Sequence, residues 1–157
     1  CVHVPGSAVR LHVDESMHLD HENLDVYKTS VDFAAWAYAL CKGLTGNNRF
    51  ARDQLLRASQ SIALNIAEGC GKAPAGERGR FFQIASGSAR ECAAVLDILE
   101  RCGAVSPDHT KTGKALLVRI VAMLTRMIEG LRQVREDGAV YVYGNENANE
   151  QKSAESP

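Results

Sequence analysis

Asn65 and Glu68 are the first candidates for chemistry in this chain, because they are polar side chains one helical turn apart in a largely apolar run. A carboxylate and an amide in that setting can form a catalytic pair. Polar residues in apolar runs more often make hydrogen bonds between helices. The sequence leaves both interpretations open, and an enzyme that uses Asn65 and Glu68 is the weaker one.

The remaining reactive side chains form no known catalytic or metal-binding motif. Among the five histidines, His18 and His21 are three residues apart, but no cysteine or carboxylate follows at the spacing of a metal site. The run from Gly69 to Lys72 lacks the strand and the spacing of a phosphate loop, so it predicts a helix-ending turn. We therefore expect no metal, no cofactor and no enzymatic activity.

The cysteines indicate a protein of the cytoplasm. Their number, five, is odd, and none forms a Cys-x-x-Cys pair, so buried and reduced thiols are expected. No apolar stretch reaches the roughly 18 residues that a membrane helix needs. The first residues lack the charged and apolar regions of a signal peptide, and Met17 is a candidate for the natural start.

Charge divides the chain into three parts. Residues 24–135 hold 16 Lys and Arg against 10 Asp and Glu, a net charge of +6, whereas residues 1–23 carry −3 and residues 136–157 carry −4. A basic middle part favours a nucleic-acid-binding surface, although an ordinary solvated face has the same composition. The candidate nucleic-acid-binding residues flank one expected helical hairpin, and they are Arg49, Arg52, Arg57, Lys72, Arg78 and Arg80.

Hydrophobic periodicity predicts an all-α protein with four helices, over residues 24–42, 48–69, 76–102 and 108–135. Short connections between helices of this length predict an antiparallel up-down four-helix bundle. Residues 1–23 lack this periodicity and are expected to form a flexible segment, with a weak strand pattern over residues 2–13. Residues 136–157 are polar and acidic, so we expect a disordered tail.

The apolar positions of each helix predict its buried face. On the first helix they are Leu24, Tyr27, Val31, Ala34, Tyr38 and Cys41. On the second they are Leu55, Ser59, Ile62 and Ile66. On the third they are Phe81, Ala85, Ser88, Cys92, Val95, Leu99 and Cys102.

The fourth helix has two adjoining apolar rows, which begin at Leu116 and Leu117. So wide an apolar face predicts a central position in the bundle or a contact with another subunit. Trp36 lies off the apolar row of the first helix, which predicts that it covers a neighbouring helix or another protein.

Small residues on the facing sides of the second and third helices predict a close approach of their backbones. Gly87 destabilises a helix by roughly 1 kcal/mol relative to alanine, so we expect a packing reason for it. A hairpin that turns near residues 73 and 74 places Arg57 level with Glu91 and Glu68 level with Arg80. We expect an ion pair at each level, which fixes register more than it adds stability.

A resemblance begins at Leu24-Asp-Val-Tyr27 and strengthens along the chain. It continues at Gln54-Leu-Leu-Arg-Ala58 and at Ser61-Ile-Ala-Leu-Asn-Ile-Ala-Glu-Gly69. It extends through Gly71-Lys72, Phe81, Ile84-Ala85, Gly87-Ser88 and Glu91. Over about residues 24–132 the chain resembles the four-helix-bundle family encoded in intervening sequences of bacterial 23S rRNA genes. The motif residues that we expect to be structural are Asn65, Glu68, Gly69, Gly87 and Glu91.

The resemblance implies an antiparallel four-helix bundle that assembles as a homo-oligomer, with a pentameric ring as the expected form. Relatives serve diversity-generating retroelements as accessory proteins that bind nucleic acid beside a reverse transcriptase. The family offers no catalytic residues to transfer. Three positions depart from its pattern: Ala63 replaces a proline, Lys72 an arginine and Arg78 an aromatic residue.

These observations lead us to expect a non-enzymatic oligomer that binds RNA, or an RNA–DNA intermediate, through a basic surface. The alternative is an assembly module that recognises another protein through the face of Trp36 and does not bind nucleic acid.

Overall fold

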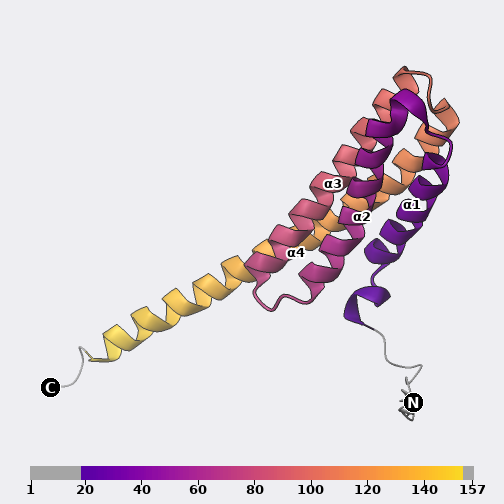
Figure 1. Ribbon diagram of the computed structural model, residues 1–157. Coiled ribbons are helices and arrows are strands. Elements are labelled where there is room, and N and C mark those ends of the chain that lie inside the picture. The colour runs from indigo at the N-terminus through magenta and orange to yellow at the C-terminus, as the bar shows by residue number, and fades with distance from the viewer. Residues whose placement is uncertain (1–18, 154–157) are drawn as a thin grey trace, which may run out of the picture.

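The chain folds as four helices joined by short connections. The computed structural model describes residues 19–153, and it describes side chains as far as residue 134. In that part of the chain the elements are η1 (Asp20–Asn23), α1 (Asp25–Cys41), η2 (Gly46–Asn48), α2 (Arg49–Cys70), α3 (Ala75–Arg101) and α4 (Pro107–Ser153). Each helix runs opposite to the one before it (Figure 1), so the predicted all-α up-down bundle is confirmed.

The end of the fourth helix differs from the prediction. The backbone of α4 continues to Ser153, and its last part extends beyond the bundle (Figure 1), whereas the sequence predicted an end at Arg135. Polar residues such as Glu, Gln and Lys are good helix formers, so the loss of apolar periodicity does not by itself end a helix. The expected strand over residues 2–13 lies outside the described residues.

The connections follow local turn chemistry. Gly103 ends the α3 segment with a φ of 70°, a left-handed conformation that glycine adopts without a steric penalty. Pro107 then opens α4, where its missing N–H group is no loss. The backbone N–H of His109 donates to Ser106 Oγ at 3.4 Å, which satisfies one of the free donors of the first turn.

The core between α2 and α3 largely matches the predicted faces. All four predicted residues of α2 are buried, and Leu55, Ile62 and Ile66 are fully so. Each such side chain stabilises the fold by roughly 1.5–3 kcal/mol. On α3 the predicted ends were wrong, because Phe82 is buried in place of the half-buried Phe81 and Cys102 is exposed.

The predicted face of α1 was only partly right, because Cys41 is buried and Leu24 and Tyr27 pack on the core, but two predicted residues are exposed. Val31 and Tyr38 are 43% and 47% exposed, whereas Phe33 and Ala37 are fully buried. Polar residues within the buried face misled the prediction. The buried Thr29 Oγ1 donates to the carbonyl of Asp25 at 2.7 Å, and Ser30 makes the equivalent bond to Val26. Satisfied in this way, a hydroxyl group can occupy a core position.

Two glycines mark close helix contacts, and neither is Gly87. A Cβ atom on Gly69 would lie 2.7 Å from the ring of Phe82, and one on Gly113 would lie 2.6 Å from Trp36 Cζ3. Gly87 is exposed, and a Cβ atom there would meet nothing within 4 Å. The prediction that Gly87 lies in the α2–α3 contact was therefore wrong, because its position on α3 faces outward.

Trp36 and the wide face of α4 are largely accounted for inside one chain. Trp36 stacks on Phe33 with ring centroids 5.5 Å apart and also packs over Gly113 of α4. The two apolar rows of α4 supply three buried residues, Leu117, Ile120 and Leu124, together with six half-buried residues that pack on the core. The sequence predicted that Trp36 covers either a neighbouring helix or another protein, and within this chain it covers a neighbouring helix.

Candidate nucleic-acid interface

The six predicted basic residues do not form one patch. Arg49 and Arg52 lie in the first turn of α2, and Lys72 follows its last turn. Lys72 lies 20 positions after Arg52, which corresponds to about 30 Å along the axis of a helix. The sequence placed these residues beside one hairpin, but the length of α2 separates them into two ends of the bundle.

Three of the six form ion pairs with carboxylates. Arg52 contacts the neighbouring Asp53 at 2.8 Å, and Arg57 contacts Glu91 across α2 and α3 at 3.3 Å. The predicted Arg57–Glu91 pair is therefore confirmed. Exposed pairs of this kind contribute only about 0–1 kcal/mol, and phosphate oxygens can compete for the same guanidinium groups.

The predicted pair between Glu68 and Arg80 was wrong. Glu68 contacts Lys72 instead, at 3.4 Å, because Lys72 lies one turn further along the same chain segment. The Lys72 ammonium also lies 5.3 Å from the centre of the Phe81 ring, a weak cation–π contact. Arg80 is exposed and has no ion pair with a described carboxylate.

Arg78 has a structural contact. Its Nε and Nη2 atoms donate to the carbonyl oxygen of Lys72 at 3.1 and 2.9 Å, just after the end of α2. This double hydrogen bond holds the turn between α2 and α3 and satisfies a carbonyl that has no helical partner. Arg78 is therefore a weaker candidate for binding phosphate than its charge suggested.

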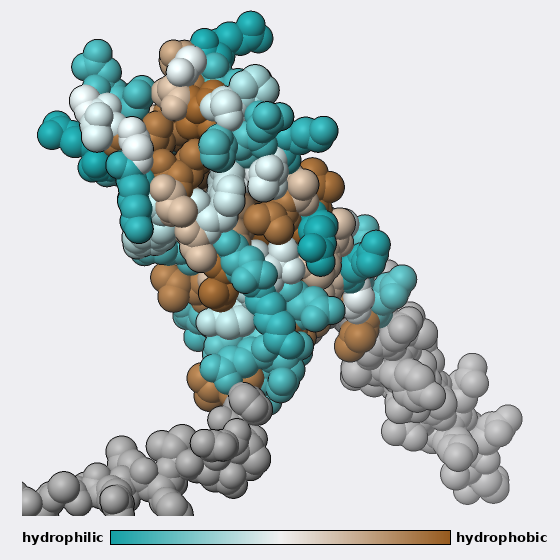
Figure 2. Space-filling model, turned by 90° about the vertical axis from the view of Figure 1, so that its right-hand side faces the viewer, coloured by the Kyte–Doolittle hydropathy of each residue, from teal (hydrophilic) through white to brown (hydrophobic). Residues whose placement is uncertain are grey.

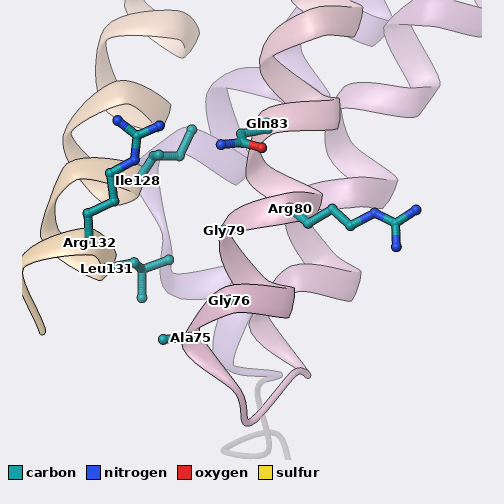
Figure 3. A pocket seen from close by; sticks show the side chains of 8 residues that line it. All are labelled: Ala75, Gly76, Gly79, Arg80, Gln83, Ile128, Leu131 and Arg132. Carbon is teal, nitrogen blue, oxygen red and sulfur yellow. The ribbon is translucent and has the colours of Figure 1, made fainter. Parts of the chain in front are cut away.

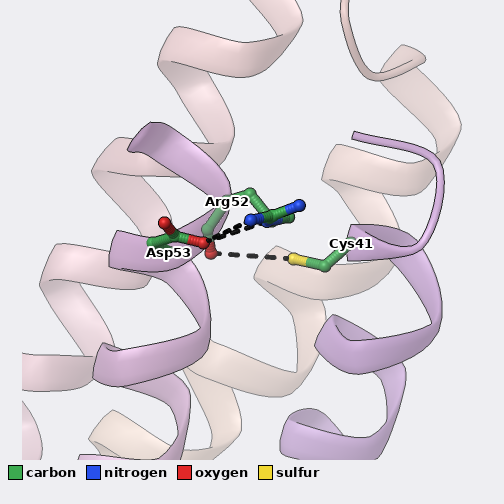
Figure 4. Close-up of polar contacts among 3 residues, drawn as sticks. All are labelled: Cys41, Arg52 and Asp53. Atoms are coloured by element: carbon green, nitrogen blue, oxygen red, sulfur yellow. Dashed lines mark hydrogen bonds and ion pairs between the residues drawn. The ribbon is translucent and has the colours of Figure 1, made fainter. Parts of the chain in front are cut away.

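Figure 4 shows how α1 meets the start of α2. The Cys41 thiol donates to the backbone carbonyl of Arg52 at 3.9 Å, while the Arg52 side chain turns to Asp53. Burial raises the pKa of Cys41, the Arg52 charge opposes this shift, and Asp53 adds to it.

In the core, burial and then the neighbouring Glu91 raise the pKa of Cys92 to about 12. The thiols of Cys41 and Cys92 are both reduced and stay protonated at neutral pH.

A groove between α3 and α4 contains basic residues that the sequence analysis did not select. At the end near the α2–α3 turn, a hollow of about 180 Å³ is lined by Gly76, Gly79, Gln83 and Arg132, among others. Figure 3 shows Arg132 of α4 and Gln83 of α3 on facing sides of this hollow, with the Arg80 side chain leaving α3 on the other side. The small glycines leave room between the helices.

The groove continues along the bundle. Its next part, about 240 Å³, is lined by Gln83, Arg90, Glu129 and Arg132, together with Ser86 and Thr125, whose hydroxyl groups already make hydrogen bonds within their own helices. Arg90 donates to the Ser86 carbonyl at 3.2 Å and has no ion pair with a described carboxylate. The charge of α4 was visible in the sequence, but its position relative to Arg90 depends on how α3 and α4 pack.

Two polar residues of α2, Asn65 and Ser61, are linked to each other and through Ser61 to α3. The Asn65 side-chain amide donates to the Ser61 carbonyl at 2.7 Å, and Ser61 shares a hydrogen bond of 2.8 Å with Ser88. Asn65 and Glu68 thus have separate partners and do not converge on one point. Among residues 19–134, no group of three His, Cys, Asp or Glu side chains is arranged to hold a metal ion.

The surface of the bundle mixes polar and apolar side chains. In Figure 2, which views the side at the right of Figure 1, apolar residues gather in separate patches between polar ones. Over the described part of the chain, no helix has the length and apolar character to cross a membrane.

The fold defines a small four-helix-bundle protein, with arginines from α3 and α4 lining the groove between these helices. The chain belongs to the 23S rRNA-intervening sequence protein family, whose model matches residues 22–126. A comparison with curated proteins gives no match. The chain is similar to a protein of unknown function from the S23 ribosomal protein family of Bacteroides thetaiotaomicron. The two sequences are 24% identical, and the two structures superpose with a TM-score of 0.62. The match covers 66% of this chain and 97% of the other. The similarity supports the four-helix fold.

Proposed function

We propose that this protein is a non-enzymatic homo-oligomer that binds RNA, or an RNA–DNA intermediate, through the basic surface of its bundle. One observation carries the proposal: most of the bundle's positive charge is not neutralised. In the described residues, ion pairs with carboxylates involve four basic side chains, which are Arg52, Arg57, Lys72 and Lys114. Of the other described basic groups, Arg78 donates to the Lys72 carbonyl and Arg90 to Ser86, and the rest have no ion pair with a described carboxylate that would compete with phosphate oxygens.

The best surface for this binding is the α3–α4 side together with the end near the α2–α3 turn. Arg90 and Arg132 line the α3–α4 groove with Gln83 as a further hydrogen-bond donor, and Arg80 extends from α3 on the other side, near the α2–α3 turn (Figure 3). Arginine suits phosphate because its planar group donates two parallel hydrogen bonds. Such contacts recognise the nucleic-acid backbone and need no base-specific motif.

Assembly would strengthen this binding. Several copies multiply the number of phosphate contacts, so weak single sites add up through multivalency. The resemblance makes a pentameric ring the expected form and an accessory role beside a reverse transcriptase the expected setting. The buried, reduced Cys41 and Cys92 support a cytoplasmic location for this role.

Fluorescence anisotropy with labelled structured RNA and labelled DNA tests the proposal, using the full-length chain at about 50 and 200 mM salt. We expect binding at the lower concentration and strong weakening at the higher one, because phosphate contacts release counterions. Replacing Arg80 and Arg132 by alanine should weaken binding. The matched control replaces Lys42 and Arg101, two exposed basic residues at the other end of the bundle that are not among the candidates. Absence of binding to either nucleic acid at 50 mM salt contradicts the proposal.

A second candidate function is assembly with another protein. Its support is an apolar stretch of the α3–α4 groove, about 520 Å³, lined by Ala93, Val118 and Val121 and flanked by Arg90 and Lys114. The Trp36 face is a poorer candidate for such a partner, because Trp36 packs on α4. A pull-down tests this function. It is favoured if a reverse transcriptase co-purifies with the natural protein and no longer does so with the Val118→Lys variant.

A further inference from the structure

Four large apolar side chains are exposed on the side of the bundle formed by α2 and α3. On α2, Phe50 is 82% and Leu64 is 65% exposed, and on α3, Ile98 is 57% and Ile84 is 42% exposed. The two residues on each helix are 14 positions apart, which is close to four turns, so each pair lies along one stripe. Apolar side chains repeated at this spacing on neighbouring helices form a surface suited to a partner.

The midpoints of the two stripes are Arg57 and Glu91, which lie seven positions from each apolar residue of their helix. Arg57 and Glu91 contact each other at 3.3 Å, and the Ser61–Ser88 hydrogen bond of 2.8 Å fixes the same register between the helices. In this register Phe50 is level with about Ile98, and Leu64 is level with about Ile84. Glu68 is level with about Arg80.

The surface is complementary to itself. A rotation about an axis parallel to the helices keeps every residue at its own height. When α2 of one copy lies beside α3 of the next, Phe50 therefore meets Ile98 and Leu64 meets Ile84. At the same time Arg57 of one copy meets Glu91 of the next, so apolar groups face apolar groups and opposite charges face each other.

We propose that copies of this chain assemble around such an axis, with α2 of each copy packed on α3 of the next. The occupant of the α2–α3 surface is thus a second copy of the chain. The proposal rests on the homo-oligomer of the proposed function and names the surface that forms it. A rotation of 180° closes the assembly at two copies, and a smaller rotation closes it as a larger ring.

Gly87 fits this arrangement. It lies on the outer stripe of α3, one turn after Ile84 and one turn before Glu91, and its helix has open space beside it. Glycine weakens a helix at an exposed position, so the fold of one chain gives no reason for it. In the assembly, the missing side chain lets Leu64 of the next copy approach the α3 backbone.

Analytical ultracentrifugation of the full-length chain at micromolar concentration tests the inference. We expect a mass that is a multiple of 17.0 kDa for the natural sequence. Leu64→Lys and Ile98→Lys each place a charge in the contact, and each should raise the concentration at which the assembly dissociates by at least about tenfold. Val118→Lys is the matched control, because Val118 is equally exposed at 68% but lies on the α3–α4 side. The control should keep the mass of the natural protein.

The outcomes separate the two proposals. A natural protein of 17.0 kDa contradicts the homo-oligomer and with it the α2–α3 contact. An oligomer that Leu64→Lys and Ile98→Lys leave intact overturns the α2–α3 contact alone. Circular dichroism should show the same helix content in all variants, since both lysines replace exposed residues. RNA binding by the dissociated variants then measures how far assembly strengthens the interaction.

Discussion

Gly113→Ala should destabilise the fold, because the space next to Gly113 is filled by Trp36. The new Cβ atom would lie 2.6 Å from Trp36 Cζ3 and 2.9 Å from Leu96 Cδ1, both closer than packed carbon atoms approach. Overpacking of this kind costs about 1–3 kcal/mol. Alanine also improves helix propensity by about 1 kcal/mol, so the net loss should be about 0–2 kcal/mol.

Gly130→Ala isolates the clash. It carries the same propensity gain and meets nothing within 4 Å, so the two variants should differ by about 1–3 kcal/mol in the free energy of unfolding. Urea unfolding followed by circular dichroism, at one fixed protein concentration, measures this difference. Trp36→Phe should restore part of the loss in the Gly113→Ala background. If Gly113→Ala is as stable as Gly130→Ala, then Trp36 does not pack over Gly113 and its face is open to a partner.

Three further predictions concern a glycine, an arginine and the cysteines. Gly87→Leu should leave the free energy of unfolding of the dissociated chain within about 1 kcal/mol of the natural value, because the space beside Gly87 is open. A drop in melting temperature above about 4 °C contradicts this expectation. Arg78→Ala should destabilise by about 1–3 kcal/mol through loss of two charged hydrogen bonds, and Arg78→Lys should restore little. Exposed Cys102 should react with iodoacetamide in native protein at pH 8, whereas Cys92 should not, because its pKa of about 12 keeps the thiol protonated. If native Cys92 is modified as fast as Cys102, as read by mass spectrometry, its burial is contradicted. The thiol of Cys92 in the unfolded chain ionises near pH 9, so the free energy of unfolding should fall progressively between about pH 9 and 12.

The sequence predicted the second helix best, because its apolar residues follow one uninterrupted pattern. Leu55, Ser59, Ile62 and Ile66 were all expected to be buried, and all are. The first helix was harder, since Thr29 and Ser30 occupy core positions that a pattern of apolar residues cannot indicate. Their hydroxyl groups are satisfied by the carbonyls of their own helix, which is a local geometry rather than a property of residue type.

The candidate site could not be predicted in full, because it depends on distances between residues that are far apart in the sequence, and local patterns do not report such distances. The sequence identified the basic residues of the α2–α3 hairpin but not their separation along α2, and it did not bring Arg90 and Arg132 together. Gly87 and Gly113 show the same limit. Both are glycines inside helices, and only the packing of α1 and α3 against α4 explains why Gly113 is the one in close contact.

The dependence of RNA affinity on salt tests the central claim most directly. Anisotropy titrations of the full-length chain at several salt concentrations give the slope of log K against log salt, which reports the number of phosphates contacted. We predict a steep negative slope that becomes shallower when Arg80 and Arg132 are replaced by alanine, with Lys42 and Arg101 replacements leaving it unchanged. A flat slope, or equal effects of the two pairs of replacements, contradicts a phosphate-binding surface at the α3–α4 side of the bundle.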